Sequence, residues 1–246
     1  MIKSSFIFLP GIGKKKEREL SLKYDWNSFL KTSKIEGIGL KRKVYYDSLV
    51  KRAKDALLND DVAYLASIFP LSEHYRFYKY YRDEAVFLDI ETTHVTGDLT
   101  VVGLFDGDRS KTMIAGYNLD LVALKKELSR YKLIVTYNGN TFDLPFLRSK
   151  HDILPDVLCV DLKVICRRLG FVGGLKKIEK ELGIKRENEI VDNLRGGDAA
   201  KLYRMWRGSG DEHYLKQLVE YNEEDAVNLQ TIADNLISRL DRNGVI

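Results

Sequence analysis

The 246-residue sequence is poor in the side chains that build disulfide frameworks and metal sites based on sulfur or imidazole. Its only two cysteines, Cys159 and Cys166, form no Cys-x-x-Cys pair and have no histidine beside them. A reduced, structural role is therefore favoured over a redox or zinc site. The histidines form no ligand pattern either and are interpreted as incidental. They are His74, His94, His151 and His213.

Long apolar runs are also missing, since none reaches the length needed to span a membrane. The segment 1–10 has one lysine and a brief apolar patch, which is too short for a signal sequence. We therefore expect a cytoplasmic protein with no membrane partner. The hydrophobic content of 44% supports a packed core, and the length suits one large domain or a domain with a smaller appendage.

The charge is unevenly distributed along the chain. Residues 1–84 hold 17 Lys and Arg against 11 Asp and Glu, a net charge of +6, whereas residues 85–246 carry a net charge of −2. Helical patterning in the first segment gives way to strand patterning at residue 85. These shifts predict a basic helical region at 1–84 and a second domain at 85–246. The basic character of residues 1–84 suggests a polyanionic partner.

Two Gly-Ile-Gly segments, 11–13 and 37–39, each precede a basic stretch with helical character. Such a turn directs backbone N–H groups at an anion, and the following helix adds its positive dipole end. The pattern resembles the hairpins of helix-hairpin-helix domains, which grip phosphates without reading sequence. A flexible turn before a helix is the competing interpretation, and the first copy has only about eight residues before it. The residues expected to contact the phosphate backbone are Gly11, Gly13, Lys14, Gly37, Gly39 and Lys41.

Residues 65–84 are rich in aromatic side chains interleaved with Arg and Lys. Such a stretch either stacks on bases or packs one domain against another, and we favour packing. From residue 85 three strands follow in sequence and then alternate with helices, which predicts a mixed five-stranded sheet flanked by helices. The expected strands cover about 86–93, 98–104, 111–117, 133–137 and 157–160. The expected helices cover about 119–131, 142–147, 162–169, 175–182, 199–206 and 212–240.

The first predicted strand carries Asp89 and Glu91 at the end of a continuous apolar run. Side chains on a strand repeat every two residues, so these carboxylates share a face and repel each other. Carboxylate oxygens suit hard divalent ions such as Mg²⁺ or Mn²⁺, which would offset this repulsion. An acidic strand end open to solvent is the alternative, unless other segments supply further ligands.

Two later segments supply candidate ligands. Asn138 ends a predicted strand, and Asp143 falls in the first turn of the next helix, where the helix dipole favours its ionised form. Tyr221 and Asp225 lie four residues apart in the long last helix and share a face. An acidic side chain on an inward face needs a partner, which a metal site would provide.

That face of the last helix is extended by Leu218 and Leu229, which is why we expect it to point inward. Glu223 and Glu224 lie off this face and are expected to be solvated. A tyrosine alone would usually be a core residue, and each acid alone a cap or surface group. Their combination reverses that expectation and favours a metal site.

The order Asp-x-Glu, Asn-x-x-x-Phe-Asp and Tyr-x-x-x-Asp resembles the three exonuclease motifs of the DnaQ-like (DEDD) superfamily, which has a ribonuclease H-like fold. Val219 stands where a histidine would mark the other subclass, so the chain is similar to the tyrosine (DEDDy) subclass. The likeness is greatest to the YprB-like branch and covers nearly the whole chain. The segments that carry it are 9–13, 87–93, 135–139, 142–147, 174–179 and 220–225. One departure is His94, where a glycine often follows the threonine pair.

The resemblance implies hydrolysis of phosphodiester bonds by two Mg²⁺ or Mn²⁺ ions per site. By resemblance, Asp89 bridges both ions, Glu91 and Asp225 complete the one that holds the attacking water, and Asp143 holds the other. Tyr221 would orient that water or help to deprotonate it. The terminal nucleotide would be contacted by Thr92, Asn138 and Phe142. Action from the 3′ end of single strands is likewise implied by the resemblance alone.

Three functions compete at this point. The leading expectation is a metal-dependent 3′→5′ exonuclease on single-stranded DNA. A ribonuclease that trims RNA 3′ ends would use the same carboxylates, because nothing in the sequence marks a sensor for the 2′-hydroxyl. A nucleic-acid-binding or recruitment protein with an inactive nuclease domain is the third. The intact acidic set argues against it, since an inactive domain would be free to lose ligands.

Overall fold

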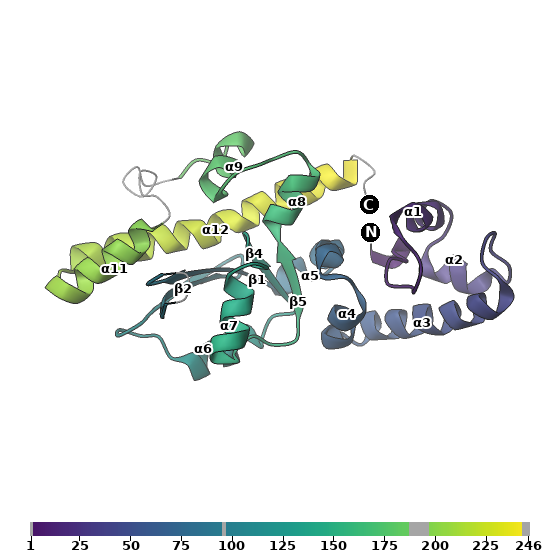
Figure 1. Ribbon diagram of the computed structural model, residues 1–246, viewed down its shortest axis with the longest axis horizontal. Helices are drawn as coiled ribbons and strands as arrows, with labels where there is room; N and C mark the ends of the chain where they lie inside the picture. Colours follow the sequence, from purple (N-terminus) through teal and green to yellow (C-terminus); the bar gives the residue numbers. More distant parts are fainter. Residues whose placement is uncertain (1, 95–96, 187–196, 243–246) are drawn as a thin grey trace.

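The computed structural model describes residues 2–94, 97–186 and 197–242. Its centre is a five-stranded mixed sheet in the order β3-β2-β1-β4-β5 (Figure 1). The strands are β1 Ala85–Thr92, β2 Leu99–Phe105, β3 Ser110–Ile114, β4 Leu133–Thr136 and β5 Leu158–Asp161. The sheet and its flanking helices confirm the predicted α/β class.

Strand β1 lies in the middle because both of its faces are covered. Val86, Leu88 and Ile90 point into one apolar cluster, and Phe87 on the opposite face points into another. β1 runs antiparallel to β2 and parallel to β4, and β4 runs parallel to β5. The parallel strands β1, β4 and β5 therefore end at the same edge of the sheet.

Helices cover both faces of the sheet (Figure 1). On one face lie α6 Leu121–Leu128 and α7 Asp143–His151. The other is crossed by the long helix α12, whose buried stripe includes Leu218, Leu229 and Leu236. The helices on this second face are α8 Leu162–Arg168, α9 Leu175–Leu182, α11 Asp198–Ser209 and α12 Glu212–Arg242.

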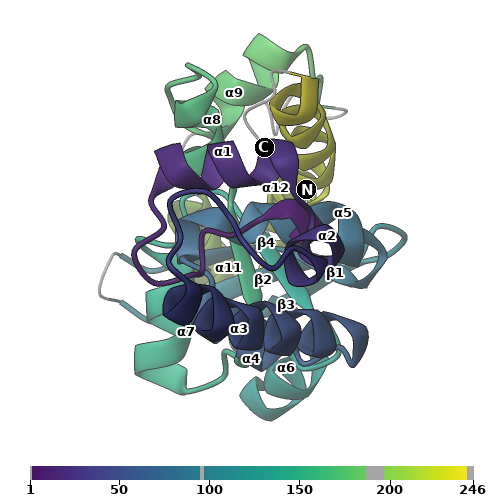
Figure 2. The same cartoon turned by 90° about the vertical axis from the view of Figure 1, so that its right-hand side faces the viewer.

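All regular elements in the described part of residues 2–84 are helices, as predicted. Three of them form a lobe at one end of the molecule (Figures 1 and 2). They are α1 Lys14–Lys23, α2 Trp26–Lys31 and α3 Leu40–Leu58. The lobe is joined to the sheet by α4 Val62–Ile68, the 3₁₀ helices η2 Leu71–Phe77 and η3 Arg82–Glu84, and α5 Tyr78–Tyr81, while η1 Ile2–Ser4 begins the described chain.

The aromatic stretch at 65–84 belongs to the core. Tyr75, Phe77 and Tyr78 are buried in the same apolar cluster as Phe87 of β1. Packing is therefore confirmed as the role of these side chains, and base stacking is not available to them. Because that cluster is continuous across residues 84 and 85, the two predicted regions share a core. Their division into domains stays a prediction.

Most element boundaries match the predictions to within two residues. Two of the differences, near residues 114 and 120, have a visible cause. The strand expected at 111–117 ends at Ile114, because Asn118 accepts a hydrogen bond from the Ile114 N–H at 2.7 Å and the chain turns at Gly116 with φ +77°. The helix expected at 119–131 starts only after Asp120, whose side chain accepts from the Val122 N–H at 2.8 Å and acts as the N-cap.

Both cysteines are buried and unpaired, which fits the predicted structural role. His74 is also structural, since its Nδ1 accepts from the Cys159 N–H at 3.1 Å. Among the described residues, no helix combines the length and the apolar character that crossing a membrane requires.

Candidate metal centre

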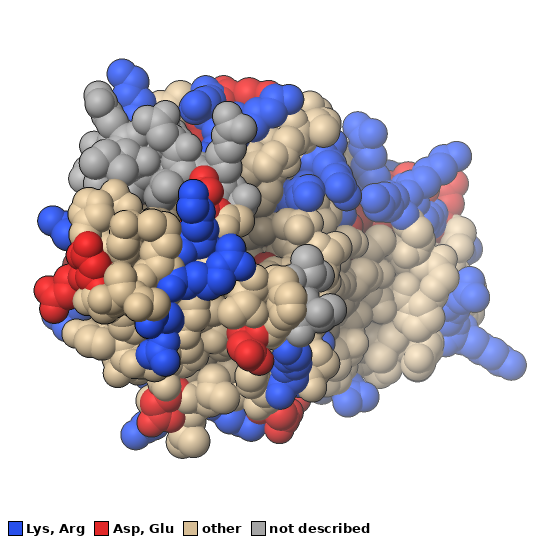
Figure 3. All heavy atoms as spheres, turned by 60° about the vertical axis from the view of Figure 1, so that its left-hand side comes forward, with Lys and Arg blue, Asp and Glu red and all other residues tan. Residues whose placement is uncertain are grey.

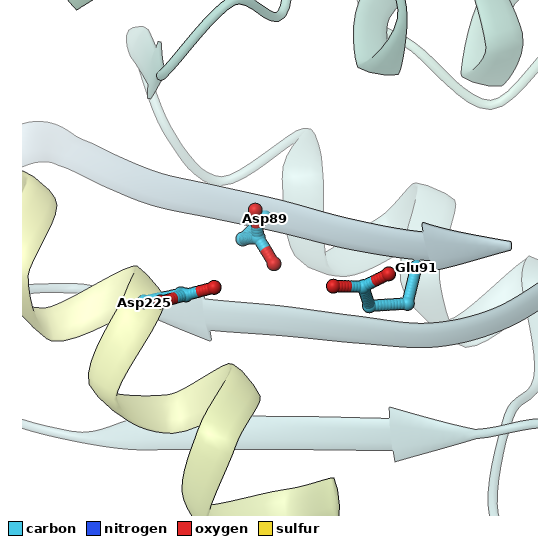
Figure 4. A group of neighbouring side chains, drawn as sticks. All are labelled: Asp89, Glu91 and Asp225. Atoms are coloured by element: carbon cyan, nitrogen blue, oxygen red, sulfur yellow. The ribbon is translucent and has the colours of Figure 1, made fainter. Parts of the chain in front are cut away.

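Three carboxylates converge where β1 meets α12. Asp89 and Glu91 project from the same face of β1, and Asp225 projects toward them from α12 (Figure 4). One oxygen from each lies within 4.8 Å of the others. The strand period of two and the position of Asp225 on the inward face of α12 produce this grouping, as the sequence predicts.

The three carboxylates are poorly solvated and repel one another. Burial, followed by the charges of Asp225 and Asp143, raises the pKa of Glu91 to about 8. Burial and the neighbouring Asp225 and Glu91 likewise raise the pKa of Asp89 well above its usual range. The pKa of Asp225 is also raised by burial, although Arg186 opposes the shift. Within the described residues, the positive charge of Arg186 therefore offsets only part of the negative charge of this cluster.

Asp143 lies beside this group but outside the set of three in the described structure. Its Oδ1 accepts a hydrogen bond from the Ile90 N–H at 3.3 Å, which turns the carboxylate toward the backbone of β1. Burial raises the pKa of Asp143 to about 7, although the backbone N–H groups of Asp143 and Ile90 oppose the rise. The N–H group at the helix start lowers the pKa of Asp143, in the direction expected of the helix dipole, but burial raises that pKa by more.

Tyr221 is buried on α12 one turn before Asp225. Its ring is flanked by the Lys176 ammonium at 5.4 Å and the Arg186 guanidinium at 5.8 Å from the ring centre. Burial and the neighbouring carboxylates raise the pKa of the Tyr221 hydroxyl far above its usual range. In this state the hydroxyl is protonated and can act as a hydrogen-bond donor.

Two supporting contacts were not predicted from the sequence. Asn222 donates from Nδ2 to Asp89 Oδ2 at 2.9 Å, and Arg186 donates from Nη2 to Asp225 Oδ1. Gly103 lies opposite Asp89 on β2, and a Cβ there would fall 2.2 Å from Asn222 Oδ1. A glycine inside a strand marks such a close approach, and this was the one sequence signal available.

Glu223 and Glu224 were expected in solvent but are only partly exposed. Glu224 has a side chain only 19% exposed, with an oxygen 3.9 Å from Arg186 Nη1. Glu223 accepts from the Thr112 hydroxyl at 3.5 Å. Helix α12 packs against α9 on one side and against the sheet on the other. More of its surface is therefore buried than the single inward stripe that the sequence predicts.

The loop between β4 and α7 is fixed from β5. Asp161, at the end of β5, accepts from the Asn138 N–H at 2.8 Å and from the Asn140 N–H at 3.1 Å. Asn138 itself has φ +67°, a conformation that Asn tolerates better than most residues. This loop leads directly into Phe142 and Asp143, so Asp161 helps to set where α7 starts.

The other predicted substrate residues lie around the same strand ends. Thr92 is buried at the end of β1, where the pairing with β2 shifts register after Glu91. Asn138 and Phe142 bound the loop held by Asp161 and are partly exposed. The structure thus brings these three residues to the strand ends that carry the acids.

The glycines and lysines predicted to grip phosphate lie in the α1–α3 lobe and are not part of this centre (Figures 1 and 2). The two turns repeat one geometry: Ile12 N–H donates to Leu9 O at 3.0 Å, and Ile38 N–H donates to Ile35 O at 3.1 Å. Gly11 and Gly37 have φ of +77° and +74°. Gly13 and Gly39 are the N-caps of α1 and α3, and neither helix start has a side-chain cap.

Figure 3 shows that one face of the molecule is hollowed and that Lys and Arg side chains gather around the hollow. Lys176 of α9 lies over Tyr221, with its ammonium 5.4 Å from the ring centre. Lys150 of α7 donates to Gly97 O and lies 5.0 Å from the centre of the Phe146 ring. A rim of this charge favours an anionic ligand above the carboxylates.

The donor set fits a hard divalent cation. Asp89, Glu91 and Asp225 offer only carboxylate oxygens, which suit Mg²⁺ or Mn²⁺. Burial, and then repulsion by neighbouring acids, raises the pKa of Asp89 and Glu91, and a bound cation would stabilise their ionised form. The charge of Asp143 also raises the pKa of Asp89 and of Glu91, so a fourth carboxylate lies near the three.

Comparison with known proteins agrees with this fold. The model of the RNase_H superfamily matches residues 86–237. "DNA polymerase 1" of Aeropyrum pernix is 27% identical over 156 residues, which are 57% of this chain and 15% of the polymerase. The structure of the family B DNA polymerase from Pyrobaculum calidifontis has a TM-score of 0.50 at 19% identity and covers 63% of this chain and 24% of that one. The chain thus spans a small part of each polymerase, and the structural likeness shows the fold alone.

Proposed function

Because the chain belongs to the RNase_H superfamily, we propose that it is a metal-dependent nuclease, specifically a 3′→5′ exonuclease on single-stranded DNA. The observation that carries this proposal is the convergence of Asp89, Glu91 and Asp225 within 4.8 Å. Among the described residues Arg186 is the cation that contacts these carboxylates, and it offsets only part of their charge, which suits the binding of Mg²⁺ or Mn²⁺. The basic rim around the hollow suits the phosphates of a substrate (Figure 3).

Each acid has a role in this account. When bound, divalent ions lower the pKa of a coordinated water and stabilise the charge on the leaving oxygen. Asp89 lies between Glu91 and Asp225 and would serve both ions (Figure 4). Glu91 and Asp225 would hold the ion on the water side, and Asp143 would hold the second. Tyr221, as a buried donor beside Asp225, would orient the attacking water.

The substrate end is proposed to lie against Thr92, Asn138 and Phe142. These residues stand at the ends of β1 and β4 and at the start of α7, beside the acids. The 3′→5′ direction rests on the motif resemblance. The preference for DNA rests on the sequence likeness to a DNA polymerase over 57% of the chain.

The α1–α3 lobe is proposed as a second contact with the nucleic-acid backbone. Its two repeated turns leave the N–H groups at the starts of α1 and α3 without side-chain caps, and Lys14 and Lys41 stand exposed at those starts. Helix N-termini favour phosphate, and contacts of this kind do not depend on sequence. Lys16 has another task, since its ammonium donates to Glu36 O at 3.4 Å and links the two turns.

A degradation ladder tests the proposal. Single-stranded DNA and RNA of the same sequence, each labelled at the 5′ end, are incubated with the protein in Mg²⁺ or Mn²⁺, beside Asp89→Ala. We expect a ladder that shortens from the 3′ end on DNA and is absent in the variant. A ladder on RNA alone would make the protein a ribonuclease. Retained binding with no cleavage in either metal would indicate an inactive binding protein.

A further inference from the structure

The guanidinium group of Arg186 stands beside the metal carboxylates. It comes from the segment that follows α9, and its side chain is only 2% exposed. Its Nη2 donates to Asp225 Oδ1, so one of the three proposed metal ligands is already held by a cation from the protein. Arg186 lies in none of the sequence motifs that point to the metal site.

Arg186 is itself anchored. Its Nε donates to Glu179 Oε2 at 3.0 Å and its Nη2 donates to Glu179 Oε1 at 2.9 Å, a bidentate pair with a fixed geometry. Glu179 has a side chain 2% exposed on the inner face of α9 and also accepts from Asn228 of α12 at 3.0 Å. These bonds tie the end of α9 to α12 at the level of the metal centre.

One interpretation is that Arg186 merely fills the place of a missing metal and leaves when an ion binds. Its environment argues against this. Departure would leave Glu179 buried without its cation, which is costly in a poorly solvated site. Glu179 also offsets the positive charge of Arg186, so the net charge of the centre stays strongly negative while Arg186 remains. Arg186 and a metal ion are therefore compatible.

The direction of the contact suggests what Arg186 does for Asp225. It binds one oxygen, Oδ1, and Figure 4 shows an oxygen of Asp225 directed toward Asp89 and Glu91. A carboxylate held by one oxygen has lost its freedom to rotate about its terminal bond. Groups that orient metal ligands in this way typically contribute 10-fold to 100-fold to metal affinity.

We propose that Arg186 is a positioning residue of the metal centre, which together with Glu179 holds the Asp225 carboxylate in the orientation that binds metal. The inference deepens the proposed function and rests on it, because it requires that the carboxylates bind a divalent ion. It predicts an effect on metal affinity in the absence of nucleic acid. A purely structural strap between α9 and α12 would alter stability and leave that affinity unchanged.

The test is Mn²⁺ binding by isothermal titration calorimetry on the purified, metal-free protein. We expect Arg186→Gln to bind Mn²⁺ roughly 10-fold to 100-fold more weakly than wild type. Arg186→Lys should recover little, because an ammonium group cannot bridge Glu179 and Asp225 as a planar fork does. Arg82→Gln is the matched control: it removes an Arg–Asp pair with Asp234, away from the centre, and should leave binding unchanged.

The double variant Arg186→Gln/Glu179→Gln separates positioning from damage, because it leaves no unpaired buried acid behind. We expect it to bind Mn²⁺ as weakly as Arg186→Gln. Wild-type or tighter affinity in Arg186→Gln, or restored affinity in the double variant, would overturn the positioning role. Equal binding by wild type and Asp89→Ala would overturn the metal site itself, and the proposed function would fail with it.

Discussion

Asn222 of α12 donates to Oδ2 of Asp89 at 2.9 Å across a gap that only a glycine at position 103 leaves open. Gly103 is paired with Asp89 in the β1–β2 ladder, and a Cβ on it would lie 2.2 Å from Asn222 Oδ1. Three elements thus fix one carboxylate: β1 carries it, α12 orients it, and β2 makes room for the orienting amide.

This relationship predicts a non-additive pair of substitutions. Gly103→Ala should destabilise the protein, because its methyl group overlaps the Asn222 amide. Asn222→Ala should weaken Mn²⁺ binding, since Asp89 loses its donor. In the double variant the overlap is gone. Its loss in the free energy of unfolding should therefore be smaller than the sum of the losses in the two single variants, by a coupling energy of about 1–3 kcal/mol.

Urea unfolding of the four proteins measures that coupling. Gly208→Ala is the matched control, because it adds a methyl group within α11 where nothing lies within 4 Å. It should be neutral or slightly stabilising, as glycine is a poor helix former. Strictly additive losses for the Gly103 and Asn222 substitutions would contradict the account of how Asp89 is held.

The raised carboxyl pKa values predict how metal-free stability depends on pH. The pKa of Glu91 is 4.5 in an ordinary environment and about 8 in the fold, and that of Asp143 rises from 3.8 to about 7. Between these values the folded state binds more protons than the unfolded chain. The free energy of unfolding should therefore fall as the pH rises from about 4.5 to about 8.

Thermal melting without metal across this pH range measures the effect, with Glu91→Gln as the comparison. Because Gln does not titrate, the melting temperature of the variant should fall less steeply with rising pH than that of the wild type. Mn²⁺ affinity should rise over the same range, because the ion binds deprotonated carboxylates. A wild-type melting temperature that increases from pH 5 to pH 8 would be incompatible with these pKa shifts.

Asp161 offers a test of how the β4–α7 loop is held. Its carboxylate accepts from the N–H groups of Asn138, Asn140 and Lys163, and the last of these makes it the N-cap of α8. Asp161→Ala leaves these donors without their acceptor and should cost about 2 kcal/mol or more of stability. Chemical denaturation measures the loss. The control is Asp156→Ala, at an exposed position. An equal loss of stability in both variants would show that Asp161 does not hold the loop.

The α1–α3 lobe makes a separate prediction about salt. Lys14→Gln/Lys41→Gln should weaken the binding of all single-stranded sequences alike, because it removes one proposed phosphate contact at each turn. The slope of log affinity against log salt should decrease by roughly 0.7 for each lost contact. Fluorescence anisotropy with labelled oligonucleotides measures both quantities.

A matched change in charge separates a phosphate contact from a general electrostatic effect. Lys125→Gln/Lys126→Gln removes the same charge from α6, on the other part of the molecule. It should leave the salt slope nearly unchanged. Equal slopes for wild type and the Lys14/Lys41 variant would show that the two turns do not contact phosphate.

Local periodicity accounts for what could be predicted. The alternation of side chains along β1 put Asp89 and Glu91 on one face, and the spacing of four residues put Tyr221 and Asp225 on one face of α12. The order of strands and helices then predicted the mixed sheet. These inferences need only the regular geometry of one element, which the sequence specifies directly.

Contacts between distant elements could not be predicted in this way. Arg186 reaches Asp225 from a segment outside regular structure, and Asp161 at the end of β5 binds Asn138 just after the neighbouring strand β4, so neither contact has a periodic signature. Burial around α12 could not be judged from one amphipathic stripe, which is why Glu224 was expected in solvent. The orientation of Asp143 depends on a backbone N–H of β1 that no side-chain pattern reveals.

The most direct test of the central claim is a crystal of the protein soaked in Mn²⁺ and measured for anomalous scattering. We expect a manganese peak bounded by oxygens of Asp89, Glu91 and Asp225, at about 2.1 Å from its ligands. Arg186 should remain on Glu179 with the ion bound. Full soaking with no peak between these carboxylates would contradict the assignment of a metal centre.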